Sequence, residues 1–137
     1  MDEPEPWQPK LWGRTRRLSE YPTGHACLAE AVAGGHSSRH HHPTRSTAFF
    51  VLHGELLVEE WDSGPPVGFP PVTRRLLADD ALVVPAGVWH RFVAVTPLAV
   101  IETYQTTRPP FDGTDPSPDI VRYDEGGVGS PSYGEVV

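Results

Sequence analysis

This sequence has a single cysteine, no long apolar run and no excess of basic charge. Cys27 is the only cysteine, so no disulfide can form within the chain and nothing indicates an oxidising compartment. No apolar run approaches the length of a membrane span, and residues 1–17 lack the apolar core of a secretion signal. We therefore expect a cytoplasmic protein with no membrane partner.

The charge balance argues against nucleic acid as a partner. The chain has 18 acidic and 11 basic residues, a net charge of -7, which disfavours attraction to phosphate backbones. A small-molecule substrate is the expected partner. The length of 137 residues fits one domain, and its 16 prolines and 13 glycines predict many turns between short strands rather than long helices.

The pattern along the chain predicts an all-β barrel or sandwich flanked by two tails. We expect a flexible N-terminal tail over residues 1–10, the β-barrel over 11–107, and a Pro/Gly-rich C-terminal tail over 108–137. That tail should pack on the barrel or a partner subunit and end in disorder. Residues 25–33 fit a strand, with a short helix as the alternative. Further strands are expected at 47–52, 55–61, 81–84, 90–95 and 98–104, with a tight hairpin turn at His53-Gly54.

Three histidines form the clearest functional pattern. His40 and His42 are two residues apart on an expected strand, where alternate side chains share a face. His90 follows a Pro-x-Gly turn and could reach the same point from a neighbouring strand. Three imidazoles suit one divalent transition metal ion, either Fe, Mn, Zn, Ni, Co or Cu. His41, between the first two, should face the other side of the sheet and stay in solvent.

The spacing around these histidines resembles the cupin superfamily. Its first motif is matched by Gly34, His40, His42 and Gly54, and its second by Pro85, Gly87 and His90. The sequence departs from the second motif at Asp79 and Ala94. Small sugar-associated cupins share further features of this chain, namely the Trp12-Gly13 pair, the GHSS segment before the histidines, HRF at the second motif and DIVR at 119–122.

This resemblance implies a single-domain jelly-roll β-barrel that holds a metal ion and pairs into a homodimer. The main departure is Thr47, which occupies the position of the family's usual glutamate ligand. Glu102 is the candidate replacement, because normal alternation places Val100, Glu102 and Tyr104 on one face, where an unpartnered carboxylate would be costly to bury. A Glu102 side chain in solvent is the alternative.

Three functions are compatible with such a site. The first is a metal-dependent isomerase or epimerase of a sugar derivative, in which the metal stabilises an enediolate and Glu102 or Tyr104 moves the proton. The second is a three-histidine Fe(II) dioxygenase, and the third is a non-catalytic cupin that binds or senses a small molecule. Arginines are candidates for binding an anionic group of the ligand: Arg39, Arg45 and Arg122.

Overall fold

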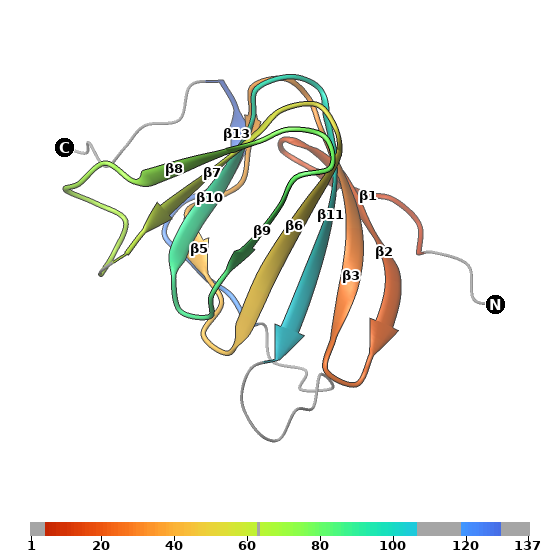
Figure 1. Cartoon of the computed structure of the whole chain (residues 1–137), viewed down its shortest axis with the longest axis horizontal. Helices are drawn as coiled ribbons and strands as arrows, with labels where there is room; N and C mark the ends of the chain where they lie inside the picture. Colours follow the sequence, from red (N-terminus) through yellow and green to blue (C-terminus); the bar gives the residue numbers. More distant parts are fainter. Residues whose placement is uncertain (1–4, 63, 107–118, 130–137) are drawn as a thin grey trace.

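The computed structural model describes residues 5–62, 64–106 and 119–129, which form thirteen β-strands in two antiparallel sheets (Figure 1). This arrangement confirms the predicted all-β jelly roll. The first sheet has the order β1 (Gln8–Lys10), β2 (Gly13–Tyr21), β3 (Gly24–Ala31), β11 (Leu98–Thr106), β6 (Arg45–His53) and β9 (Ala81–Val84). Within these ranges, no helix has the length and apolar character needed to cross a membrane.

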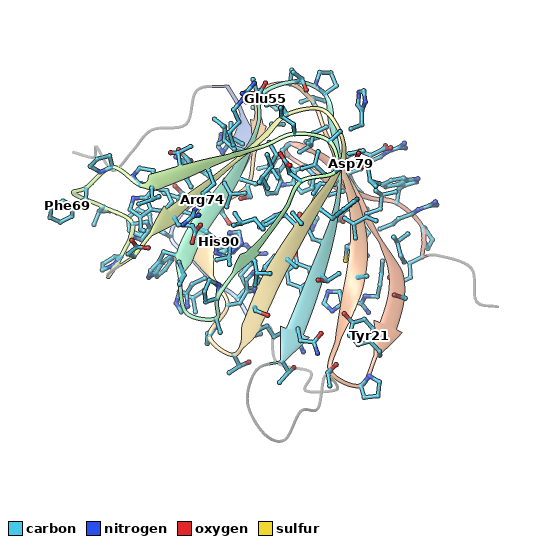
Figure 2. All side chains as sticks on the ribbon, in the orientation of Figure 1. Tyr21, Glu55, Phe69, Arg74, Asp79 and His90 are labelled. Carbon is cyan, nitrogen blue, oxygen red and sulfur yellow. The ribbon has the colours of Figure 1, made fainter. Side chains whose placement is uncertain are left out.

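The second sheet is centred on β10 (Trp89–Ala94). On one side of β10 lie β4 (Gly35–His36) and β5 (His40–His41), which pair in turn with β13 (Gly127–Val128) and β12 (Val121–Arg122). On its other side lies β7 (Leu56–Trp61), followed by β8 (Val72–Leu76). Figure 2 shows Phe69 at the outer end of the loop that joins β7 to β8.

The core lies between the inner faces of the two sheets. Alternate side chains of β6 and β11 point inward, so Phe49, Val51 and Val100 are buried while Phe50 and Leu52 remain 40% and 45% exposed. This alternation carries over to the polar residues of the same strands. It places Thr47 and Glu102 on the inward face, where the candidate site described below lies.

The turn at His53-Gly54 differs from the hairpin that the sequence predicts. Gly54 does adopt a positive φ of 94°, but β6 pairs with β9 and β11, whereas β7 pairs with β8 and β10. The turn therefore carries the chain from one sheet to the other. A side chain at Gly54 would place its Cβ 2.2 Å from the carbonyl oxygen of Pro97, so the close approach of two turns also requires glycine here.

Strand β9 is present as predicted but is not buried as a whole. Only Val84 is buried, while Val83 is 59% exposed. The reason is position, because β9 is the edge strand of its sheet and pairs only with β6. The segment predicted as a strand at 25–33 is a strand and not a helix, and it runs from Gly24 to Ala31 as β3.

Both expected tails contribute strands to the barrel. Gln8–Lys10 lies within the segment predicted to be a flexible tail but forms β1, where the Trp7 ring packs under the guanidinium of Arg14 at 4.0 Å. An edge strand tolerates the missing N–H of Pro9. In the C-terminal segment, β12 and β13 pack on the barrel. The predicted disorder of the last ten residues falls mostly outside the described residues.

Candidate metal centre

The structure brings His40, His42 and His90 together in one buried cluster. One ring nitrogen from each lies within 4.8 Å of the others, and among the described residues this is the group that could hold a metal ion. The ring centroids are 4.4 Å apart for His40 and His90, 5.0 Å for His40 and His42, and 5.5 Å for His42 and His90. Antiparallel pairing of β5 and β10 sets His40 directly opposite His90.

A backbone carbonyl fixes the orientation of each imidazole. The Nδ1 atoms of His40, His42 and His90 lie 2.7, 2.7 and 2.8 Å from the carbonyl oxygens of Ser38, Asp119 and Val88. A carbonyl can only accept, so each ring carries its proton on Nδ1 and keeps a lone pair on Nε2.

The Nε2 atoms are left in the state that a metal ligand requires. Those of His42 and His90 are buried and make no hydrogen bond to the described residues. A buried polar atom without a partner is costly, and a bound cation would satisfy both atoms at once. The donor set therefore fits a divalent transition metal, and a carbonyl behind each ring is the usual way of orienting such ligands.

Burial also keeps the cluster uncharged. Desolvation lowers the pKa of His90 to about 4 and lowers the pKa of His42, while burial and the neighbouring rings of His90 and His42 hold the pKa of His40 well below its usual value. Neutral imidazoles at neutral pH are available to a metal without first losing a proton.

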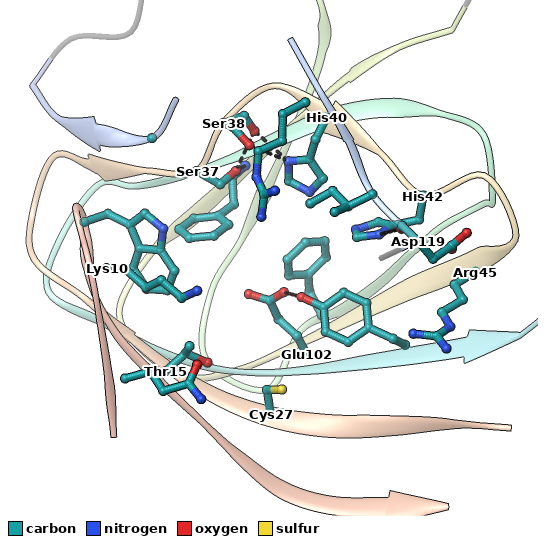
Figure 3. A pocket seen from close by; sticks show the side chains of 18 of the residues that line it. Lys10, Thr15, Cys27, Ser37, Ser38, His40, His42, Arg45, Glu102 and Asp119 are labelled. Atoms are coloured by element: carbon teal, nitrogen blue, oxygen red, sulfur yellow. Dashed lines mark hydrogen bonds between the residues drawn. The ribbon is translucent and has the colours of Figure 1, made fainter. Parts of the chain in front are cut away.

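A pocket of about 540 Å³ opens beside the cluster, and His40 and His42 line it (Figure 3). Glu102 and Tyr104 line the same pocket from β11, on the opposite sheet. The Tyr104 hydroxyl donates a hydrogen bond to the carboxylate of Glu102. Strand alternation predicted that these two side chains share one face, and both point into the pocket.

Both groups of this pair have perturbed acidity. Glu102 is only 6% exposed, and its burial raises the pKa of the carboxyl group even though the hydrogen bond from Tyr104 acts in the opposite direction. Burial, together with the adjacent Glu102, raises the pKa of Tyr104 well above its usual value. Glu102 is not a member of the histidine group, so its predicted role as a metal ligand remains a prediction.

Thr47 lies on the inward face of β6 and is 1% exposed. Its hydroxyl is buried and has no hydrogen-bond partner among the described residues. The register pairs Thr47 with Tyr104 on β11, so the position of the family's usual carboxylate ligand is next to the strand that carries Glu102.

The prediction from the sequence was inaccurate for one residue near the site and omitted two others. His41, predicted to stay in solvent, is half-buried and packs against Trp89, with ring centroids 4.4 Å apart. Asp119, which accepts the hydrogen bond of His42, was not assigned to the site, although the DIVR motif that starts there was a signal. Lys10 lines the pocket from β1, and nothing in its sequence context pointed to this.

Comparison with known proteins agrees with this geometry. A family model described as a cupin domain matches residues 28–104. The uncharacterized protein YdbB of Bacillus subtilis is 38% identical over 65 residues, or 47% of this chain, and the match spans about half of that protein's length.

Solved structures show the same fold at lower identity. KdgF from Halomonas sp. superposes with a TM-score of 0.63 at 23% identity, over 77% of this chain and 92% of that one. An RmlC-like cupin from Shewanella frigidimarina superposes with a TM-score of 0.63 at 24% identity, over 80% and 89% of the two chains. Oxalate decarboxylase from Bacillus subtilis gives 0.69 at 13% identity, over 86% and 30%.

Proposed function

Because this chain belongs to the cupin family, we propose that it is a metal-dependent enzyme that moves a proton on a small polar molecule, in the manner of an isomerase or epimerase of a sugar derivative. His40, His42 and His90 would hold one divalent transition metal ion through Nε2. The ion would supply Lewis-acid polarisation of substrate oxygens. The choice of a sugar derivative rests on the sequence motifs shared with small sugar-associated cupins.

The observation that carries the proposal is the Glu102–Tyr104 pair. Two ionisable side chains share a hydrogen bond inside the pocket, across from the imidazoles. A carboxyl group whose pKa is raised by burial can hold and release a proton closer to neutral pH than a solvated one. Glu102 is therefore assigned the role of general base, and Tyr104 orients its carboxylate.

Part of the pocket wall is apolar, which supports proton transfer. Phe49 and Phe92 line the pocket and are 2% and 4% exposed. Apolar walls beside a carboxylate strengthen its interactions with a bound substrate, because the local dielectric is lower than that of water.

Deuterium exchange tests the proposal across a range of candidate substrates. The full chain is loaded separately with Mn, Fe, Zn or Ni and incubated without oxygen in D₂O with a panel of aldoses, ketoses and their acids. Loss of a C–H signal by NMR reports proton abstraction. Glu102→Gln should slow the exchange by about 10²- to 10⁴-fold, while its melting temperature and metal content confirm an intact fold. Exchange at the wild-type rate in this variant would contradict the assignment.

A dioxygenase is the second candidate, because the metal-binding group among the described residues is three histidines without a carboxylate. Oxygen uptake by the Fe(II)-loaded protein in the presence of one of the panel compounds would favour it. A purely binding cupin is the third. In that case Glu102→Gln and Tyr104→Phe would leave ligand affinity unchanged, and no compound would exchange or turn over with any metal.

A further inference from the structure

We propose that the ligand of this pocket carries a negatively charged oxyacid group, a carboxylate or a phosphate, which is bound by basic side chains around the pocket. The inference deepens the proposed function, since it takes the pocket beside the histidine cluster as the substrate site. It concerns what binds there and is independent of which reaction follows.

Basic residues are concentrated in this pocket. The chain has 11 basic residues and a net charge of -7, yet four basic side chains line the pocket, namely Lys10, Arg17, Arg45 and Arg122. They come from four different strands, β1, β2, β6 and β12, so the fold brings them together from separate parts of the chain. Figure 3 shows Lys10 and Arg45 on either side of the Glu102 carboxylate.

Among the described residues, no ion pair joins Lys10 or Arg122 to the acidic groups that line the pocket, Glu102, Asp119 and Glu125, whereas Arg17 pairs with Glu5 and Glu20 outside it. The Asp119 carboxylate accepts hydrogen bonds from Thr44, from the hydroxyl at 2.8 Å and from the backbone N–H at 3.1 Å. Glu102 accepts from Tyr104. Over the described parts of the chain, neither Lys10 nor Arg122 makes an ion pair within 4.0 Å.

The positive charges lie close enough to act on the buried groups of the site. Burial raises the pKa of Glu102, and Lys10 acts against that rise. Burial and Glu102 raise the pKa of Tyr104, and Arg122 acts in the opposite direction. A ligand anion placed beside Glu102 and Tyr104 would therefore be within the field of Lys10 and Arg122, which have no ion-pair partner among the described residues.

Arg39 shows what a structural arginine looks like in this fold. It is 5% exposed, its Nε lies 2.6 Å from the Asp124 carboxylate and its Nη1 donates to the carbonyl of Pro66 at 2.9 Å. Its Nε and Nη1 donate within the protein and it does not line the pocket, so it is not a candidate for ligand binding. By contrast, Lys10 and Arg122 have exposed side chains at the pocket.

Calorimetric titration of the zinc-loaded full chain with glucose, glucuronate and glucose 6-phosphate tests the proposal. At least one of the two acids should bind tenfold or more tightly than glucose, and which one does so separates a carboxylate ligand from a phosphate ligand. Lys10→Gln and Arg122→Gln should each reduce that preference about tenfold, as expected when a hydrogen bond to a charged group is lost. The matched control is Arg75→Gln, which removes an exposed cation outside the pocket.

Equal affinity for glucose and both acids, or no measurable binding of either acid at 10 mM (roughly the weakest affinity of interest), would overturn the proposal. So would a preference that persists in Lys10→Gln and Arg122→Gln together. Repeating the titration with metal-free protein separates the cations from the metal, because the preference should survive metal removal. Selective binding without proton exchange would leave this inference standing while the proposed function failed, and exchange without selectivity would do the reverse.

Discussion

A buried ion pair on the outer face of the second sheet should stabilise β10, the strand that carries His90, and its contribution to the free energy of unfolding can be measured. Arg91 follows His90 of the histidine cluster on β10 and points to the opposite face, where its Nε lies 2.7 Å from the carboxylate of Glu59 on β7. The two side chains are 2% and 1% exposed. Replacing Arg91 with Met leaves the Glu59 carboxylate buried without this partner, which costs about 3–5 kcal/mol.

That loss is large against the total stability expected of one domain, about 5–15 kcal/mol. With a urea dependence of about 2 kcal/mol per molar, the unfolding midpoint of Arg91→Met should fall by about 1.5–2.5 M. Methionine is a suitable replacement because its flexible side chain can still pack against the Trp61 ring, which lies 5.7 Å from the Arg91 guanidinium carbon.

The double variant Arg91→Met with Glu59→Leu removes both charges and should recover to within about 1 kcal/mol of the wild type, since apolar side chains of similar volume often replace a buried ion pair without loss. Urea unfolding of all four proteins by circular dichroism gives the coupling energy. The reasoning is refuted if Arg91→Met moves the midpoint by less than about 0.5 M, or if the double variant is as unstable as the sum of the single ones. The double variant should also retain its metal, because His90 faces the other side of the sheet.

Three further predictions concern the metal, one turn and acid stability. His90→Ala should abolish stoichiometric metal binding in elemental analysis of untagged protein, whereas His53→Ala, outside the cluster, should not; equal metal content in both would contradict the site. Gly54→Ala should cost about 2 kcal/mol or more, because it combines a φ of +94° with a Cβ 2.2 Å from a carbonyl oxygen. Gly68→Ala, at φ +82° with nothing within 4 Å, should cost less, and equal losses in thermal melts would refute the steric argument. Burial, with nearby Arg17 and Arg45, lowers the pKa of His25 to about 4, so the unfolded chain takes up the proton first. Its contribution to stability is complete above about pH 6.5 and declines as the pH falls towards 4; His25→Gln should flatten this decline, and an unchanged pH profile would count against it.

The histidine cluster and the barrel strands could be predicted because their signals are local. The spacing of two residues predicted that His40 and His42 meet at one point, and they do, although β5 ends at His41 and His42 lies in the turn that follows it. The Pro-x-Gly turn marks the start of β10. The strands with which β6 and β7 each pair could not be predicted in this way. A short turn with a positive-φ glycine is the same signal whether the strands pair with each other or enter different sheets, and the choice depends on contacts with β10 and β11.

The parts of the site that the sequence missed depend on contacts between distant segments. The backbone of Asp119 orients His42 across 77 residues, and the Asp124 carboxylate binds Arg39 across 85 residues. Composition alone labels both acidic residues as part of a Pro/Gly-rich tail. Lys10 was likewise assigned to a tail, the N-terminal one, because the sequence did not show that the neighbouring Trp7 packs against Arg14 and anchors the strand.

The histidine cluster and the cations of the pocket come from different parts of the chain. The three histidines of the cluster come from β5, β10 and the turn between β5 and β6, which lie within the matched family region, whereas Lys10 and Arg122 come from β1 and β12 outside it. Under the two proposals above, chains that share the cluster would keep one metal chemistry while their terminal segments change what the pocket binds. Exchanging β1 and β12 for those of another small cupin should alter the preference for acids over glucose in calorimetric titration and leave metal content unchanged. A loss of metal in such an exchange would show that the two halves of the site are not separable.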